Sequence, residues 1–158
     1  MLASSQWARG VRGPGERRAR IEMPVRWSDV DLFGHVNNAA FLRFLDDARF
    51  ATFPRMGVDV AGVVTDAVLV VVKHEIDYLA AVPFTSDPVT VEVWVSRIGT
   101  SSVDFGYEVR ASAGTPLLRA CSRMVQVDRG SGRPRAFSDA ERADFSRYRD
   151  DAPTLRPW

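Results

Sequence analysis

The spacing of apolar residues changes once along the chain, from a helical period to a strand period. Between about Asn38 and Phe53 they recur every three or four positions, and Pro54 ends the pattern. The broad apolar face of this predicted helix comprises Phe41, Phe44, Leu45, Ala48, Ala51 and Thr52, widened by Leu42 and Phe50. The polar stripe that remains is narrow: Arg43, Asp46 and Asp47, with Arg49 at its margin. A helix this apolar on most sides is expected to be largely wrapped by other elements.

Beyond a predicted loop at 55–65 the period becomes two, which is typical of strands. Four strand-like stretches follow, at 67–78, 89–98, 103–110 and 117–127. In the second stretch, one face carries Val89, Val91, Val93 and Val95, and the other carries Thr90, Glu92, Trp94 and Ser96. The short links IGTSS and ASAGT favour antiparallel hairpins.

Two further elements flank this pattern. The stretch 20–27 reads as a first strand, with Pro24 at an edge or a bulge. Near the end of the chain, Ser138 and Glu141 have the spacing of a capping box, which predicts a short helix. The order therefore predicts an α+β domain, one curved antiparallel sheet of about five strands around a long central helix. Self-association is the simplest way to cover the far face and the edge of that sheet.

Composition and charge narrow the class of protein. A chain of 158 residues with 46% hydrophobic and 26% charged residues is suited to one folded domain. Residues 1–20 hold five arginines against Glu16, whereas the remainder is mildly acidic, so we expect no nucleic-acid partner for the folded part. We predict a flexible basic leader at 1–19 and a single domain at 20–158.

Cys121 stands alone, which excludes an intrachain disulfide and a cysteine-based zinc site. Two histidines without a spaced acid cluster predict no metal site, and we expect no cofactor. His74 lies in a predicted strand and is expected to be a packed or rim histidine. No apolar run reaches the length of a membrane span, and a secretory signal is absent, which favours a cytoplasmic protein without a membrane partner. If residues 1–20 are a transit peptide, the alternative is mitochondrial.

The chemistry-bearing stretch is DVDLFGHVNN, directly before the long helix. A helix N-terminus offers unsatisfied N–H groups to a developing oxyanion, and the backbone N–H of Asn38 is our candidate. Asp31 can reach the same carbonyl as general base or nucleophile; the alternative is a turn or capping aspartate. His35 either orients water or the carbonyl, or is a loop histidine. Asp29 is expected at the strand end, pairing with a base.

The stretch RWSDVDLFGHVNNAAFLRFLDDAR resembles the hotdog-fold thioesterases, specifically the 4-hydroxybenzoyl-CoA thioesterase-like group. The positions that carry the resemblance are Asp29, Asp31, Gly34, Phe41, Asp46, Ala48 and Arg49. HEIDYLAAV, GTSSVDFGYEV and VQVDRGSGRP extend it over roughly 20–137. The chain departs from the family at Phe41, where tyrosine is common, and at Asp46, where glutamate is usual. Phe33 also stands where plant acyl-carrier thioesterases have asparagine, which weakens transfer of their histidine-assisted mechanism.

The resemblance implies a thioesterase that hydrolyses an acyl-CoA, or an acyl carrier protein thioester, to the free acid. It implies that Asp31 is catalytic, and we expect His35 and Asn38 to act with it. For substrate binding we expect Gly34, Val36, Asn37 and Phe41, and the resemblance adds Ser101 and Ser102. It also implies a homodimer or homotetramer with the site at the subunit interface.

Two alternatives remain open from the sequence. A non-catalytic acyl-CoA-binding module would keep the fold and use its pocket as a sensor, although the short leader is a poor output domain. A hotdog hydratase or dehydratase is disfavoured because that group's motifs are missing. The acyl preference and the choice between coenzyme A and acyl carrier protein depend on side-chain packing that the sequence does not give.

Overall fold

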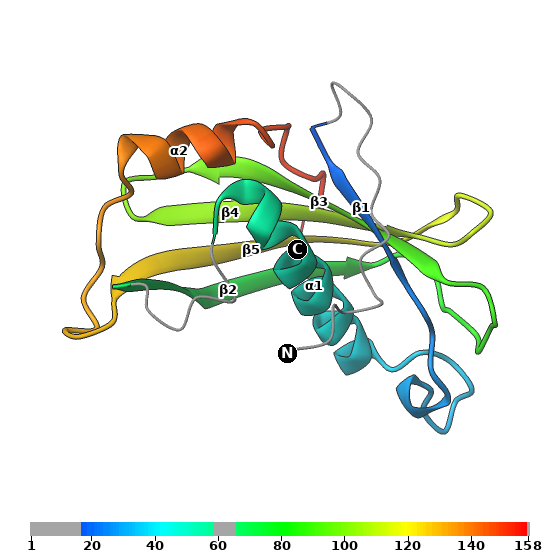
Figure 1. The fold of residues 1–158 in the computed structure, drawn as a ribbon. Coiled ribbons are helices and arrows are strands. Elements are labelled where there is room, and N and C mark those ends of the chain that lie inside the picture. Colours follow the sequence, from blue (N-terminus) through cyan, green and yellow to red (C-terminus); the bar gives the residue numbers. More distant parts are fainter. Residues whose placement is uncertain (1–16, 59–65, 158) are drawn as a thin grey trace, which may run out of the picture.

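The computed structural model describes residues 17–58 and 66–157, which form one antiparallel sheet with a long helix across one face (Figure 1). The elements are, in chain order, β1 (Ala19–Met23), α1 (Asn38–Thr52), β2 (Ala67–Tyr78), β3 (Val89–Ile98), β4 (Ser102–Arg110), β5 (Pro116–Asp128) and α2 (Asp139–Ser146). The strand order is β1-β3-β4-β5-β2, and every neighbouring pair is antiparallel. This is the predicted hotdog architecture, so the predicted fold class is confirmed.

The bounds of α1 follow from local chemistry. Asn37 is the N-cap, and its side chain accepts a hydrogen bond from Ala39 N. After Thr52 the chain tightens into a 3-10 helix that has Pro54 near its start. Gly57 follows with a φ of 73°, a left-handed conformation that favours glycine. These signals place α1 where the periodicity predicts it.

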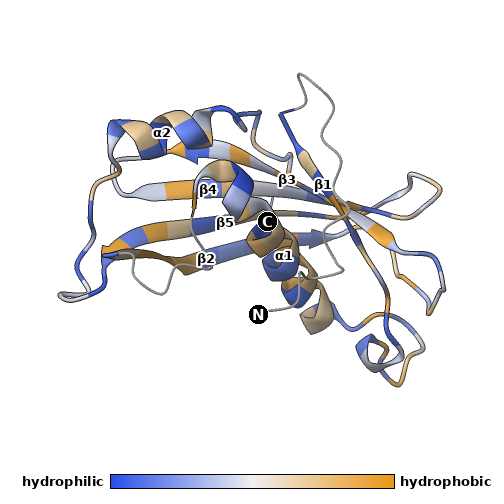
Figure 2. Cartoon of the chain, viewed as in Figure 1, coloured by the Kyte–Doolittle hydropathy of each residue, from blue (hydrophilic) through white to orange (hydrophobic). Residues whose placement is uncertain are grey.

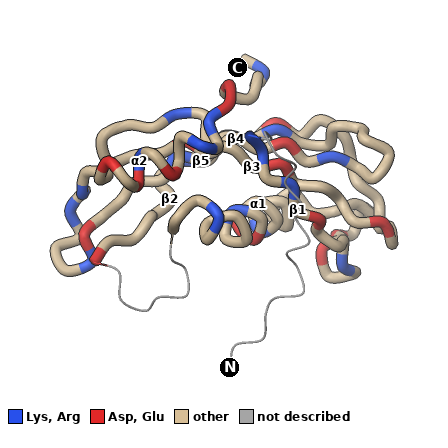
Figure 3. Tube along the Cα trace, turned by 45° about the horizontal axis from the view of Figure 1, so that its top comes forward, with Lys and Arg blue, Asp and Glu red and all other residues tan. Residues whose placement is uncertain are grey.

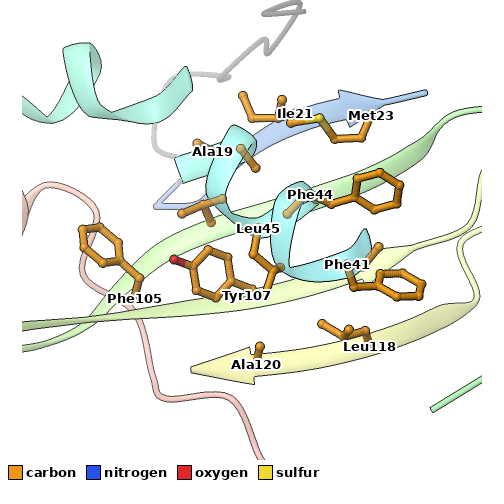
Figure 4. Close-up of a cluster of buried hydrophobic side chains, with 14 of the residues drawn as sticks. Ala19, Ile21, Met23, Phe41, Phe44, Leu45, Phe105, Tyr107, Leu118 and Ala120 are labelled. Carbon is orange, nitrogen blue, oxygen red and sulfur yellow. The ribbon is translucent and has the colours of Figure 1, made fainter. Parts of the chain in front are cut away.

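The core lies between α1 and the concave face of the sheet, as Figure 4 shows. Phe44 and Leu45 of α1 are fully buried there. The strand predicted at 89–98 is confirmed as β3, and Val89, Val91, Val93 and Val95 are all buried. The opposite face is not left open, because Glu92, Trp94 and Ser96 are buried as well. In Figure 2 the apolar segments of the strands alternate with polar ones, as expected for a sheet with one face toward a helix.

Three expectations need correction. The first strand is shorter than predicted, and residues 27–29 form a short 3-10 helix. The long helix is not wrapped on most sides, since Phe50 is 52% exposed. Arg49, expected at the margin of the polar stripe, is buried because its guanidinium donates to the hydroxyl of Tyr107 at 2.8 Å.

The far face of the sheet is partly covered by the chain itself. After α2, residues 148–150 run beside β3, where Val95 N donates to Tyr148 O and Asp150 N donates to Val95 O. The C-terminal segment then reaches β2, where Arg156 N donates to the Asp77 carboxylate at 2.6 Å. Figure 3 places this segment on the side opposite α1. Self-association is therefore not the only cover for that face.

Of the helices in the described part of the chain, none is both long and apolar enough to span a membrane.

Candidate functional site

The polar loop before α1 folds into a tight turn around Asp31. Asp31 N donates to His35 O and Gly34 N donates to Asp31 O, both at 3.0 Å. Gly34 has a φ of 77°, so the turn requires the left-handed conformation that a residue without Cβ adopts most easily. One carboxylate oxygen of Asp31 also accepts from Phe33 N at 2.9 Å. Gly34 therefore supplies the conformation that closes the turn around Asp31.

Asn37 connects this carboxylate to the helix. Its side-chain oxygen accepts from Ala39 N at 2.8 Å, which caps α1. Its side-chain amide donates to the second carboxylate oxygen of Asp31 at 3.2 Å. The Asp31 carboxylate is thus held beside the first turn of α1, with each of its oxygens in one hydrogen bond.

The N–H of Asn38 has no acceptor among the described residues, in contrast to the N–H groups of Ala39 and Ala40, which both bond Asn37. It lies in the first turn, where the helix dipole is positive. The carbonyl of Asn38 accepts from the hydroxyl of Tyr78 at 3.0 Å. An unsatisfied donor next to a carboxylate is the arrangement that acyl transfer needs.

Asp29 connects the loop to α1 and to the segment before the loop. It is buried, and its carboxylate is ion-paired with Arg43 of α1, which confirms the expected base partner. Arg26 N donates to the same carboxylate at 2.8 Å, and Asn37 N donates to the Asp29 carbonyl at 2.8 Å. Loop and helix are therefore fixed to each other on both sides of Asp31.

The loop also packs against the segment before β3. Val36 is buried and its N–H donates to Val82 O at 2.7 Å, while His35 pairs with Pro83 in an isolated bridge. The His35 side chain is exposed and makes no hydrogen bond with the described residues. Asp31, Gly34, His35, Asn37 and Asn38 thus form one local cluster, as the motif predicts.

Of the other predicted binding residues, Phe41 lies at the edge of this cluster, whereas Ser101 and Ser102 lie far from it. Phe41 is buried and meets the ring of Tyr78 edge-on, with centroids 5.9 Å apart. Ser101 and Ser102 lie at the β3–β4 hairpin, at the opposite end of β3 from the loop, about 30 Å away along a ten-residue strand. Within one subunit they cannot share a substrate carbonyl with Asp31.

Large exposed apolar side chains lie in the loop next to Asp31 and on the segments that flank the loop. Leu32 and Phe33 follow Asp31 directly and are 103% and 85% exposed. Trp27 and Phe84 are exposed as well and meet edge-on, with centroids 5.7 Å apart. Exposed large apolar residues that gather on one part of a protein surface mark an interaction site, and these four are candidates for one.

The sequence did not single out Tyr78 or Arg43, because neither has a spacing that links it to the loop. Tyr78 ends β2, so its contact with Asn38 depends on the sheet order. Burial raises the pKa of the Tyr78 phenol, which keeps it a neutral donor. His74 is exposed and its Nδ1 lies 2.6 Å from the Ser122 hydroxyl, which agrees with a rim position.

Within residues 17–58 and 66–157, no group of three histidine, cysteine or acidic side chains is arranged to hold a metal ion. The chemistry of the loop is therefore that of one carboxylate, one histidine and the donors of a helix N-terminus.

Comparison with known proteins identifies the class. The family model of the thioesterase-like superfamily matches residues 25–145, which include the loop, α1 and all of β2 to β5. The chain belongs to this superfamily.

The relatives and solved structures agree with this assignment. The protein YsmA of Bacillus subtilis (strain 168) is 29% identical over 122 residues, covering 77% of this chain and 80% of YsmA. The PA2801 protein of Pseudomonas aeruginosa has a TM-score of 0.71 and 30% identity, covering 78% of this chain and 95% of that one. A thioesterase of Thermus thermophilus, solved with coenzyme A and zinc, has a TM-score of 0.71 and 29% identity, covering 86% of this chain and 97% of that one.

Proposed function

We propose that this protein hydrolyses an acyl-CoA thioester to the free acid and coenzyme A, with the Asp31 carboxylate as general base or nucleophile. The observation that carries the proposal is the pairing of two groups at the start of α1. Asn37 holds the Asp31 carboxylate there, and the neighbouring N–H of Asn38 has no acceptor among the described residues. A carboxylate and an unsatisfied donor on one turn supply both requirements of acyl transfer.

The reaction would proceed as follows. The thioester oxygen lies at the N–H of Asn38, where the helix dipole stabilises the negative charge that develops on it. As general base, Asp31 removes a proton from water while the water oxygen bonds to the thioester carbon. The carbon–sulfur bond then breaks, and the thiolate of coenzyme A leaves and takes up a proton. As nucleophile, an oxygen of Asp31 would instead bond to the thioester carbon while the carbon–sulfur bond breaks and the coenzyme A thiolate leaves, and water would then hydrolyse the mixed anhydride.

The comparisons support the substrate class. The Thermus thermophilus thioesterase binds coenzyme A in its solved structure and covers most of this chain at 29% identity. The exposed apolar side chains beside Asp31 fit an acyl group better than a polar substrate. A binding module would not need a carboxylate oriented by an asparagine at the helix start.

We propose a homodimer as the active form, with a homotetramer as the alternative. Two features support it: β2 is an edge strand, and Val70, Val71 and Val72 on it are exposed. An exposed apolar edge is a template for pairing with a second chain. A second copy would also bring its hairpin, with Ser101 and Ser102, toward the loop of the first. Light scattering tests this, and a compact particle of 17.6 kDa would contradict it.

The function is tested by mixing the purified protein with short, long and aromatic acyl-CoAs and following the release of free thiol. The single thiol of Cys121 is subtracted as a constant background. We expect turnover on at least one acyl-CoA. If the folded protein binds acyl-CoA in calorimetry but releases no thiol, the binding-module alternative is the correct function.

A further inference from the structure

The helix α1 and the edge strand β2 are linked at two separated places on the concave side of the sheet. At one place the Tyr78 hydroxyl donates to the carbonyl of Asn38, beside the Asp31 loop. At the other, the charges of Arg49 and Asp46 on α1 act on His74 of β2. Arg49 donates to the hydroxyl of Tyr107, and the Ser122 hydroxyl lies 2.6 Å from His74 Nδ1.

Partly open side chains lie between these two links. We call them the α1–β2 strip, which consists of Asn38, Leu42 and Asp46 of α1 and Tyr78, Ile76 and His74 of β2. Leu42 and Ile76 are half-buried, Tyr78 is 40% exposed, and the Asp46 side chain is 47% exposed. The strip begins at Asn38, the candidate oxyanion donor, and ends at the polar side chains of His74 and Asp46. The proposed hydrolysis uses neither of these two side chains.

The contact with Ser122 decides which ring atom His74 presents to the open side. The Ser122 hydroxyl lies 2.6 Å from His74 Nδ1, so that nitrogen is engaged within the sheet and Nε2 is the ring atom on the open side. A neutral imidazole carries one N–H, and in the tautomer in which Ser122 donates to Nδ1 this proton is on Nε2. His74 then presents Nε2–H as a donor.

The second polar group at this end of the α1–β2 strip, Asp46, is a hydrogen-bond acceptor. The Asp46 carboxylate is half-exposed, and it pairs with Arg49, so the buried cation is already neutralised. Burial, together with the charge of Arg49, lowers the pKa of His74, and Asp46 opposes this, so the imidazole is neutral at pH 7. The far end therefore combines one donor and one acceptor with no net charge. The buried Nε of Arg49 has no partner among the described residues, which leaves one further donor.

The length of the strip limits the ligand. Four residues of strand separate Tyr78 from His74, which is about 13 Å. Eight residues of helix separate Asn38 from Asp46, which is about 12 Å. Both exceed the length of a single aromatic ring, so an extended chain is needed to reach from the thioester to the polar end.

We propose that the α1–β2 strip binds the acyl chain and selects medium-length chains that end in a hydroxyl group. The hydroxyl oxygen accepts from His74 Nε2–H, and its proton is given to the Asp46 carboxylate. A methyl end leaves both groups without a partner, and a carboxylate end has no proton to give to the Asp46 carboxylate. This assignment rests on the proposed hydrolysis at Asp31, because the position of the thioester sets where the chain begins.

The test compares three acyl-CoAs of equal length: ω-hydroxydecanoyl-CoA, decanoyl-CoA and the mono-CoA thioester of decanedioic acid. For the wild type we expect kcat/KM about tenfold higher for the hydroxy chain than for the other two, the effect of one net hydrogen bond. In His74→Phe, which keeps a ring of similar size, we expect this ratio to fall to about one. In His74→Gln, which retains an amide donor, part of the preference should return.

Lys73→Gln is the matched control. It changes a charged neighbour on the same strand that is 64% exposed and paired with Glu75, outside the strip. We expect it to keep the hydroxyl preference. A general effect of charge on β2 would change the ratio in this variant as well and would overturn the assignment.

The failure of this inference is distinct from a failure of the proposed function. If the wild type hydrolyses all three substrates with equal kcat/KM, or prefers the methyl or carboxylate end, the strip does not select a hydroxyl. If it hydrolyses none, the proposed function fails, and the same ratios are then measured as dissociation constants by calorimetry. Equal constants for the three ligands would contradict the inference on its own.

Discussion

The two faces of the sheet are both buried, but by different means. On the concave face, apolar side chains such as Phe105 and Leu118 pack under Phe44 and Leu45 of α1 (Figure 4). On the convex face, acidic and basic residues lie opposite one another on neighbouring strands, as Arg20 does to Glu92 and Arg119 to Glu108. The concave face is stabilised by removal of apolar area from water, whereas the convex face is covered by paired charged side chains and by the chain's own C-terminal segment.

One row across the convex face shows the difference clearly. Residues opposite each other on successive strands are Arg20, Glu92, Glu108, Arg119 and Asp77, from β1 through to β2. Two carboxylates meet in the middle of this row, and an arginine flanks each: Arg20 lies 3.0 Å from Glu92, and Arg119 lies 3.0 Å from Glu108. The aliphatic stems of such arginines cover the sheet while their heads stay in water.

This difference between the faces predicts how much stability a substitution on each face should cost. A close-packed apolar core loses stability with every buried carbon that is removed. A half-exposed ion pair contributes little, because water and salt screen it. Substitutions on the two faces should therefore differ in size and in their dependence on salt.

The largest effect is expected for Phe44→Ala on the concave face. Phe44 is 1% exposed, so truncation leaves a cavity and should lower the free energy of unfolding by about 3–5 kcal/mol. Denaturant unfolding measures this loss. Phe50→Ala is the control on the same helix, since Phe50 is half-exposed; a loss as large as that of Phe44→Ala would mean that α1 buries a different face.

A smaller loss is expected for Gly106→Ala on the convex face. A Cβ at Gly106 would lie 2.4 Å from Cε2 of Trp94, which is fully buried. Overpacking of this kind should cost about 1–3 kcal/mol. The double variant Gly106→Ala with Trp94→Phe removes the clashing ring and should recover part of the stability of the single variant. If it recovers none, the indole is not the obstacle.

Asp104→Asn should have a still smaller effect. Both carboxylate oxygens of Asp104 accept from Arg123, at 2.7 and 2.8 Å, but the Arg123 side chain is 44% exposed. We expect a loss of about 1 kcal/mol at low salt that shrinks as salt is added. Thermal unfolding at two salt concentrations measures it. A loss that is independent of salt would show that the pair is not screened.

The smallest effect is the contribution of His74 to the pH dependence of stability. Burial, then the charge of Arg49, lower its pKa below the ordinary 6.5 in the folded state. As the pH is lowered below 6.5, His74 is protonated in the unfolded state before it is protonated in the folded state. The free energy of unfolding therefore decreases as the pH decreases, until the pKa of His74 in the folded state is passed. His74→Gln should flatten this part of the profile. An unchanged profile between pH 7 and 5 would assign the dependence to other groups.

The parts predicted from sequence are those that depend on local periodicity. The strand predicted at 89–98 has the same bounds as β3, and the capping box of Ser138 and Glu141 is present in α2. The turn and cap around Asp31 follow from short-range chemistry, because every partner lies within six residues. Local patterns therefore suffice for the elements and for the centre of the candidate site.

The rest depends on contacts between distant residues. The burial of Arg49 requires Tyr107 on β4, and the contact of Tyr78 with Asn38 requires β2 to lie at the sheet edge. The burial of Glu92 and Trp94 requires Arg18 and the C-terminal segment, which no periodicity in 89–98 indicates. The predicted leader at 1–19 falls almost entirely outside the described residues.

The central claim is that the Asp31 carboxylate acts on a thioester at the start of α1. The most direct measurement compares kcat of wild type, Asp31→Asn and Asp47→Asn on the preferred acyl-CoA. Asp47 is an exposed carboxylate on α1, so its variant controls for the loss of one negative charge. We predict a loss of at least about 100-fold for Asp31→Asn and little change for Asp47→Asn. A folded Asp31→Asn variant that turns over at the wild-type rate would contradict the account.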